Sequence, residues 1–156
     1  MVASERVLKW FVRFYPPLFF QRIWIIKFTK GFRGVHVKIS KSVFNKNYNN
    51  SIFGGTVFSA ADPFYPLLFH QILNRKGYKI VAWSKSSQIQ YLKPCMTDMR
   101  FEVNISDDDL ATCENALNAV GKHLGAYPID IYNKNGELCV TVKNEIYVRD
   151  LNYAVD

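Results

Sequence analysis

The chain has 156 residues, the size of one ordinary domain with a sizeable core. Its hydrophobic fraction of 49% excludes an intrinsically disordered chain, and its aromatic fraction of 15% favours a bulky core, a pocket or a buried interface. The net charge of +7 is placed unevenly, because residues 1–46 carry ten basic residues and one acid while the remainder is slightly acidic.

A basic end suits an anionic partner, which could be a lipid surface, a nucleic acid or a phosphate-bearing cofactor. No nucleic-acid-binding motif accompanies the charge, so we predict no nucleic-acid partner. Charged residues between Glu5 and Arg13 interrupt the opening, which therefore does not look like a secretory signal. No apolar run approaches the roughly 20 residues of a membrane span. We expect a cytoplasmic protein and consider a peripheral membrane contact through residues 4–30.

The cysteines and histidines indicate no metal site. Cys95, Cys113 and Cys139 lie far apart and match no zinc-binding spacing, which is typical of small buried side chains in a reducing compartment. The three histidines form no ligand pattern either. We therefore predict that the protein binds no metal.

The first predicted element is an amphipathic helix over residues 4–14, where apolar residues recur at helical spacing with basic residues between them. Pro16-Pro17 is expected to end it. This helix either packs across a sheet or lies in a membrane interface. Next, the β-branched and aromatic segment 22–29 and the alternating segment 35–40 predict a hairpin.

The middle of the chain predicts one long helix. Residues 43–53 are rich in Asn and predict a loop, after which Gly54-Gly55 leads into an apolar stretch that is long enough for a central helix. Residues 74–77 supply its stop.

The rest of the chain returns mostly to strands. One further helix begins at Ser106, an N-cap followed by three aspartates that favour the positive end of a helix dipole. The expected strands are 78–83 and 87–92 as one run, 97–105, 127–132 and 138–148, the last two forming a hairpin about Asn135-Gly136.

One apolar helix among antiparallel strands indicates an α+β fold, with a sheet of about five to six strands curled around that helix. We expect one domain over 1–156, with the N-terminal helix and Pro-Pro turn in 1–17 and the core in 18–150.

A known family matches the helix start. The segment Phe53–Asp62 (FGGTVFSAAD) resembles the signature of hotdog-fold acyl-CoA thioesterases of the phenylacetate-pathway type, in which His-Gly-Gly opens the central helix and an Asp follows seven residues beyond the second Gly. Asn47 and Ser84 also fall at positions of the family motif, and residues 88–94 (QIQYLKP) look like its strand ending in Pro. The full set, over about residues 15–150, is closer to an uncharacterised thioesterase-like branch of the superfamily.

The resemblance implies a hotdog fold and hydrolysis of an acyl-CoA or acyl-carrier thioester, with CoA as part of the substrate and no separate cofactor. Amides at Gly54 and Gly55, at the positive end of a helix, suit a thioester oxyanion, and glycines let a substrate approach the backbone. Asp62 could activate water or attack directly. In this scheme Asn47 positions water and Ser84 assists. The expected substrate contacts are Gly55, Phe53, Phe58, Tyr65 and Lys85.

Gly54 and Asp62 are eight residues apart, so along one helix about 12 Å separates them and one reacting carbon cannot touch both. If the two cooperate, they come from two subunits related by a two-fold axis. The sequence therefore predicts a homo-oligomer, either a dimer or a tetramer.

Each site residue also has a structural interpretation. Asp62 could cap a helix that begins at Pro63, whereas a helix running from Gly54 would be kinked there. Gly54-Gly55 could be a plain turn, Asn47 part of a solvated loop, and Ser84 and Lys85 ordinary strand and surface residues. Phe58 and Tyr65 could belong to the core.

The family's His before Gly-Gly is Phe53 in this chain, which removes a polar group beside the thioester. A non-catalytic acyl-CoA or lipid-binding protein is therefore the alternative function. A hotdog hydratase is a weaker third, because His70 is poorly spaced from a carboxylate.

Overall fold

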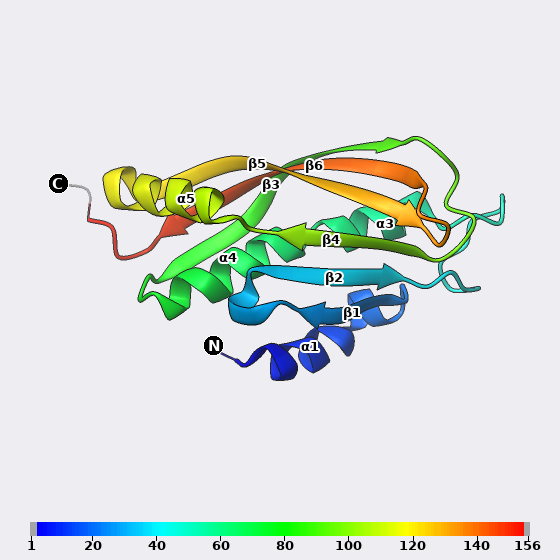
Figure 1. The fold of residues 1–156 in the computed structure, drawn as a ribbon, viewed down its shortest axis with the longest axis horizontal. Helices are drawn as coiled ribbons and strands as arrows, with labels where there is room; N and C mark the ends of the chain where they lie inside the picture. Colours follow the sequence, from blue (N-terminus) through cyan, green and yellow to red (C-terminus); the bar gives the residue numbers. More distant parts are fainter. Residues whose placement is uncertain (1–2, 155–156) are drawn as a thin grey trace.

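The computed structural model describes residues 3–154, which form one six-stranded antiparallel sheet with helices on its concave side and at its edges (Figure 1). The strands lie in the order β1-β2-β4-β5-β6-β3. Their bounds are β1 Ile23–Phe28, β2 Gly34–Ile39, β3 Ile80–Tyr91, β4 Met99–Asn104, β5 Lys122–Asn133 and β6 Leu138–Asp150. The α+β prediction is confirmed, with the six strands at the upper end of the expected range.

The predicted hairpins both form. β1 and β2 pair antiparallel across the short 3₁₀ helix η1 (Lys30–Phe32), and β5 and β6 pair across the turn at Gly136, whose φ of 80° suits a residue without a Cβ. β5 begins at Lys122, five residues earlier than predicted. The two segments before Leu92 are one strand, β3, with a bulge between Ser84 and Ser86.

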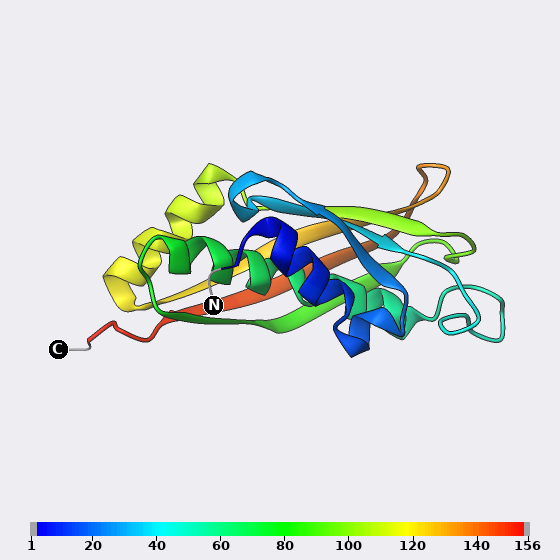
Figure 2. The same ribbon diagram turned by 90° about the horizontal axis from the view of Figure 1, so that it is seen from below.

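The predicted central helix is two helices. α3 (Gly54–Ala61) and α4 (Phe64–Arg75) are separated at Asp62 and Pro63, both of which keep right-handed helical torsion angles. Pro63 has no N–H to continue the ladder, which explains the break. Figure 2 shows α3 and α4 running along the concave side of the sheet.

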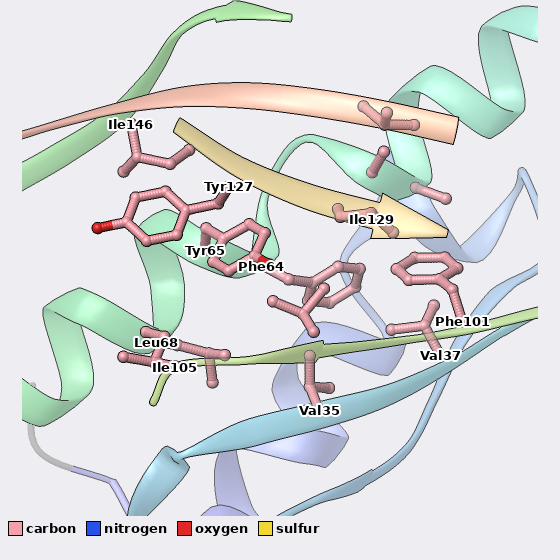
Figure 3. Packing of buried hydrophobic residues seen from close by; sticks show 14 of the residues in the cluster. Val35, Val37, Phe64, Tyr65, Leu68, Phe101, Ile105, Tyr127, Ile129 and Ile146 are labelled. Carbon is pink, nitrogen blue, oxygen red and sulfur yellow. The ribbon is translucent and has the colours of Figure 1, made fainter. Parts of the chain in front are cut away.

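The core lies between α4 and the sheet (Figure 3). On α4, Phe64, Leu68 and Phe69 are fully buried, while alternate residues of the strands, such as Val35 and Phe101, face them. This alternation is what a sheet with one buried face requires. The buried side chains therefore hold the α3–α4 pair against the sheet, and residues at either end of the pair keep a defined position relative to the strands.

The sheet has a loose seam between β4 and β5. Their register holds two pairs, Met99 with Asn133 and Arg100 with Tyr132, whereas β5 and β6 pair from Lys122 to Tyr132. Along the seam the Tyr65 hydroxyl donates a hydrogen bond of 2.7 Å to the Pro128 carbonyl.

Two further helical segments flank the sheet. α5 (Asp107–Val120) has the predicted Ser106 N-cap, completed by a capping box with Asp109, and ends at Gly121 with φ 70°. At the β1 edge of the sheet, α1 (Glu5–Arg13) packs on β1 and is followed by the short helix α2 (Pro16–Phe19). Pro16 and Pro17 thus begin a second turn of helix instead of only ending the first. Among the described residues, no helix is both long and apolar enough to cross a bilayer.

Candidate active site

The start of α3 presents unpaired main-chain donors. Phe53 is the N-cap residue, and its carbonyl accepts the N–H groups of Thr56 at 2.9 Å and Val57 at 3.3 Å. The N–H groups of Gly54 and Gly55 precede these and have no acceptor within the helix. They lie at the positive end of the α3 dipole, where a developing negative charge is stabilised.

The space above the two glycines is filled from within the chain. A Cβ at Gly54 would lie 2.9 Å from the Tyr91 hydroxyl oxygen, and one at Gly55 would lie 2.4 Å from the Phe53 ring. In this structure two aromatic side chains occupy the space that the missing Cβ atoms leave. A substrate contact at these glycines stays a prediction.

Tyr91 is the residue at this end that the motif did not identify. It is the last residue of β3, and its hydroxyl donates a hydrogen bond of 2.8 Å to the Gly54 carbonyl. Desolvation raises the pKa of Tyr91, so the hydroxyl keeps its proton and remains a donor at neutral pH. The signal that could have found it is the YLKP strand ending, which places a tyrosine at the end of the edge strand.

Asp62 lies at the other end of α3. Its N–H donates to the Phe58 carbonyl at 3.1 Å, and its own carbonyl accepts the Ser84 hydroxyl at 3.0 Å. α4 begins after Pro63, and no side chain caps its N-terminus. The interpretation of Asp62 as the N-cap of the following helix is therefore wrong, whereas the kink at Pro63 is found.

The partly exposed Asp62 lines a pocket of about 650 Å³ between the N-terminal helices, α3–α4 and β3. Phe58, Ser84 and His70 line the same pocket, as do Pro66 and Leu67 of α4. Burial lowers the pKa of His70, which favours its neutral imidazole at pH 7. The pocket thus combines an apolar wall with a carboxylate, a hydroxyl and a neutral histidine, a combination typical of small-molecule sites.

The structure places Asn47 in a second pocket, of about 520 Å³, together with Gly54 and Tyr91. The Asn47 side chain is engaged within its own loop: its amide donates to the Ser51 hydroxyl at 2.9 Å, and its oxygen accepts the N–H groups of Asn49 and Ser51. This is the loop interpretation of Asn47, with the side chain held in a turn.

The remaining predicted contacts are scattered. Phe53 is 58% exposed at the start of α3, and Phe58 is 42% exposed in the Asp62 pocket. Tyr65 is buried, packs against the Tyr127 ring and lines a different cavity, of about 840 Å³, at the seam between β4 and β5. Lys85 is the exposed residue at the β3 bulge.

The cysteines take no visible part in this chemistry. Cys95, Cys113 and Cys139 are free and buried, as expected. Burial raises the pKa of Cys95 to about 11 and that of Cys113 to about 12, so both remain protonated thiols at neutral pH. A thiol in that state is a poor nucleophile.

Within one chain, then, the predicted catalytic residues fall into two groups. Gly54 and Asn47 lie at one end of α3, and Asp62 and Ser84 lie at the other. The edge strand β3 contacts both ends, through Tyr91 and Ser84 respectively.

A family model described as "Domain of unknown function (DUF4442)" matches residues 4–148. No curated protein matches the chain. Among solved structures, a Pseudomonas aeruginosa protein described as a "Probable Thioesterase" has a TM-score of 0.79 at 14% identity, covering 96% of this chain and 98% of its own.

A Haemophilus influenzae thioesterase has a TM-score of 0.71 at 12% identity, covering 100% of this chain and 97% of its own. The Escherichia coli PaaI protein from the phenylacetic acid degradation operon has a TM-score of 0.61 at 17% identity, with 97% and 95% covered. These likenesses confirm the predicted hotdog fold.

Proposed function

The chain belongs to the family described as "Domain of unknown function (DUF4442)", and we propose that it hydrolyses acyl thioesters such as acyl-CoA at a site shared by two subunits. One observation carries the proposal: unpaired helix amides and a pocket-lining carboxylate occupy opposite ends of α3, and each end is bound to the same edge strand. The solved structures of the same fold that are described as thioesterases support the reaction class.

The chemistry follows from the two ends of the helix. The N–H groups of Gly54 and Gly55 can donate to a thioester oxygen as it becomes an oxyanion. Asp62 takes a proton from water, whose oxygen attacks the carbonyl carbon, or it attacks that carbon itself. The C–S bond then breaks, and the thiolate leaves with the proton that Asp62 took from water. If Asp62 itself attacks, water then hydrolyses the mixed anhydride that forms and supplies the proton. The acyl chain lies against the apolar wall formed by Phe58, Pro66 and Leu67.

A two-fold axis at β3 brings the two ends together. β3 is the last strand of the sheet, so one of its sides has no strand partner among the described residues. Because Lys85 is the extra residue of the β3 bulge, antiparallel pairing of two β3 edges that sets Ser84 opposite the partner subunit's Tyr91 centres on Gln88. Because Ser84 contacts Asp62 and Tyr91 contacts Gly54, this register places the carboxylate of one subunit near the glycine amides of the other.

The test is thiol release from a panel of acyl-CoA substrates, followed with a thiol-reactive dye, for the native protein and Asp62→Asn. Removing the general base is expected to lower turnover by about 10²–10⁴-fold. Stability should change little, because the Asp62 side chain caps no helix. Asp130→Asn is the matched control, since Asp130 is an exposed carboxylate of β5 that lines other pockets. Equal turnover by native protein and Asp62→Asn would remove Asp62 from the reaction.

The second candidate is an acyl-CoA-binding protein without catalysis. The observation that favours it is Phe53, whose ring stands where the family has His and packs over Gly55. Acyl-CoA bound stoichiometrically, with no thiol released by the native protein, would select this function over hydrolysis.

A further inference from the structure

The N-terminal helix exposes its apolar side. Successive helical residues are rotated by about 100°, so α1 divides into two apolar faces. Leu8 and Val12 are partly buried against the core, while Val7, Phe11 and Phe14 point away from it and are exposed. A surface helix of a globular protein ordinarily turns charged residues outward.

This outward stripe continues into the segment that follows. We call it the N-terminal aromatic face, defined by Trp10, Phe11, Phe14, Tyr15 and Phe20, whose exposed fractions run from 48% to 66%. Figure 1 shows α1 at the outer edge of the sheet, beside β1. Large aromatic side chains at such exposure are unusual when they adjoin one another, and a patch of this kind marks an interaction surface.

Trp10 and Phe14 of this face belong to a connected array of rings that continues into Phe19 and Trp24. Phe14 stacks with Trp10 and with Phe19, each at 6.1 Å between centroids, and Phe19 makes an edge contact with Trp24 at 5.7 Å. The Arg13 guanidinium lies over the rings of Trp10 at 5.2 Å and Trp24 at 5.4 Å. Arg22 covers Trp24 as well, at 5.2 Å. These contacts hold the array in place without burying it.

The face is also surrounded by positive charge. Residues 1–46 contain one acid, Glu5, and its carboxylate accepts the Gly31 N–H at 3.0 Å. On the helical wheel, Arg6 and Arg13 flank the Trp10 side of the stripe. Lys27 and Lys30 follow on β1 and η1, and both are exposed. A second copy of this chain would oppose one basic face with another, so charge disfavours self-association through it.

We propose that the N-terminal aromatic face docks the protein on a membrane surface that contains anionic lipid. Aromatic rings, tryptophan above all, settle at the boundary between headgroups and acyl chains, and basic residues beside them attract anionic headgroups. This docking is independent of hydrolysis. It also places the lipid beside the Asp62 pocket, because Val12 and Tyr15 line that pocket from the same segment.

The experiment is co-sedimentation of the full chain with phosphatidylcholine vesicles, with and without phosphatidylglycerol, at low and high salt. Native protein should bind the anionic vesicles at low salt and dissociate at high salt. Phe11→Ser with Phe14→Ser should lower the partition coefficient at least about ten-fold. Arg6→Gln with Lys30→Gln should lower it by about five-fold for each charge.

Control substitutions elsewhere on the surface test whether the loss of binding is specific to this face. Phe44 is 73% exposed in the loop before α3, and Lys134 is exposed in the turn after β5, so Phe44→Ser and Lys134→Gln should bind vesicles like the native protein. No native binding at low salt, or equal binding by the Phe11/Phe14 variant, would overturn the proposal.

Light scattering tests whether a second copy of the chain covers the face instead of lipid. A lower molecular mass for the Phe11/Phe14 variant than for the native protein would mean that a second copy covers the face, which also overturns the proposal. Thiol release from a short-chain acyl-CoA distinguishes this result from failure of the proposed reaction. The Phe11/Phe14 variant should retain that activity, and Asp62→Asn should lose it while still binding vesicles.

Discussion

The Tyr91 hydroxyl at the end of β3 donates a hydrogen bond of 2.8 Å to the carbonyl of Gly54, the first residue of α3. These residues are 37 positions apart in the chain. The bond fixes the amide end of the helix to the edge strand. Since the Gly54 and Gly55 amides are the proposed oxyanion donors, their direction depends on this contact.

Tyr91→Phe removes that bond alone. We expect the free energy of unfolding to fall by about 0.5–1.5 kcal/mol, because a partly exposed neutral hydrogen bond contributes no more than this. The kcat for acyl-CoA should fall while KM changes less, because the amides act mainly on the transition state. Urea denaturation and steady-state thiol release measure the two effects.

Two companion variants sharpen this comparison. Tyr48→Phe removes a hydroxyl from a side chain that is 96% exposed and should change neither quantity. Gly54→Ala forces a Cβ against the Tyr91 hydroxyl, so its cost should be smaller in the Tyr91→Phe background. Additive costs for these two substitutions would contradict the contact between them.

The proposed β3 register can be tested by cross-linking. In a two-fold dimer centred on Gln88, this residue lies opposite the same residue of the partner, with Cβ atoms about 4.5–5.5 Å apart. Mild oxidation of Gln88→Cys should therefore give a covalent dimer on a non-reducing gel. The native cysteines are buried, so the native protein is the control and should remain monomeric on that gel. A monomeric particle in solution would exclude both the register and the shared site.

The local signals in the sequence predicted the elements well. Ser106 forms the expected N-cap, and Gly136 makes the expected hairpin turn. The break at Pro63 was also predictable, because a missing N–H interrupts a helix wherever it falls. These features depend on residues within a few positions of one another, where sequence spacing fixes geometry.

Contacts between distant segments were not predictable in this way. The two glycines at the start of α3 suggested open space beside the helix, but the side chains of Tyr91 and Phe53 fill that space. Tyr65, an expected substrate contact, instead donates a hydrogen bond to the Pro128 carbonyl and does not line the Asp62 pocket. A pattern of residue types does not say which side chain closes over a glycine. That depends on the course of β3 along α3, which only the folded chain fixes.

Asn144 is the polar contact that anchors the far end of α3. It is fully buried on β6, and its amide donates a hydrogen bond of 2.9 Å to the Ala61 carbonyl. Asn144→Ala leaves that carbonyl unpaired, so the free energy of unfolding should fall by about 1–3 kcal/mol. Asn115→Ala, on the exposed side of α5, should cost little.

Asn144→Ala removes both a hydrogen-bond donor and side-chain volume, and Asn144→Asp distinguishes the two effects. The carboxylate keeps the size of the amide but would face a carbonyl in a buried site, so its ionised form is strongly disfavoured. The loss of stability should therefore be greater at pH 7 than at pH 4, where the acid can keep a proton and donate it. Urea denaturation at both pH values measures this, and a pH-independent loss would mean that packing dominates.

The stability of the native protein should decrease between pH 7 and pH 5 because of two histidines. Burial lowers the pKa of His123, which lies 2.9 Å from the Tyr127 hydroxyl, and burial also lowers the pKa of His70. Their pKa values in the folded protein lie below the usual value of 6.5, so below that pH the unfolded chain binds more protons than the folded one. The stabilisation from the neutral rings is complete above pH 6.5 and is lost as the pH falls toward the folded values.

Urea denaturation across this range measures the slope, which cannot exceed about 1.4 kcal/mol per pH unit for each histidine. The lowered pKa values of Asp98 and Glu5 act in a separate window, below their usual values of 3.8 and 4.5. His70→Gln with His123→Gln should therefore reduce the change in the free energy of unfolding between pH 7 and pH 5. The decrease at lower pH, where Asp98 and Glu5 take up protons, should stay the same. An unchanged slope in this double variant would show that other groups take up those protons, and a slope of opposite sign would mean that the folded protein stabilises the charged rings.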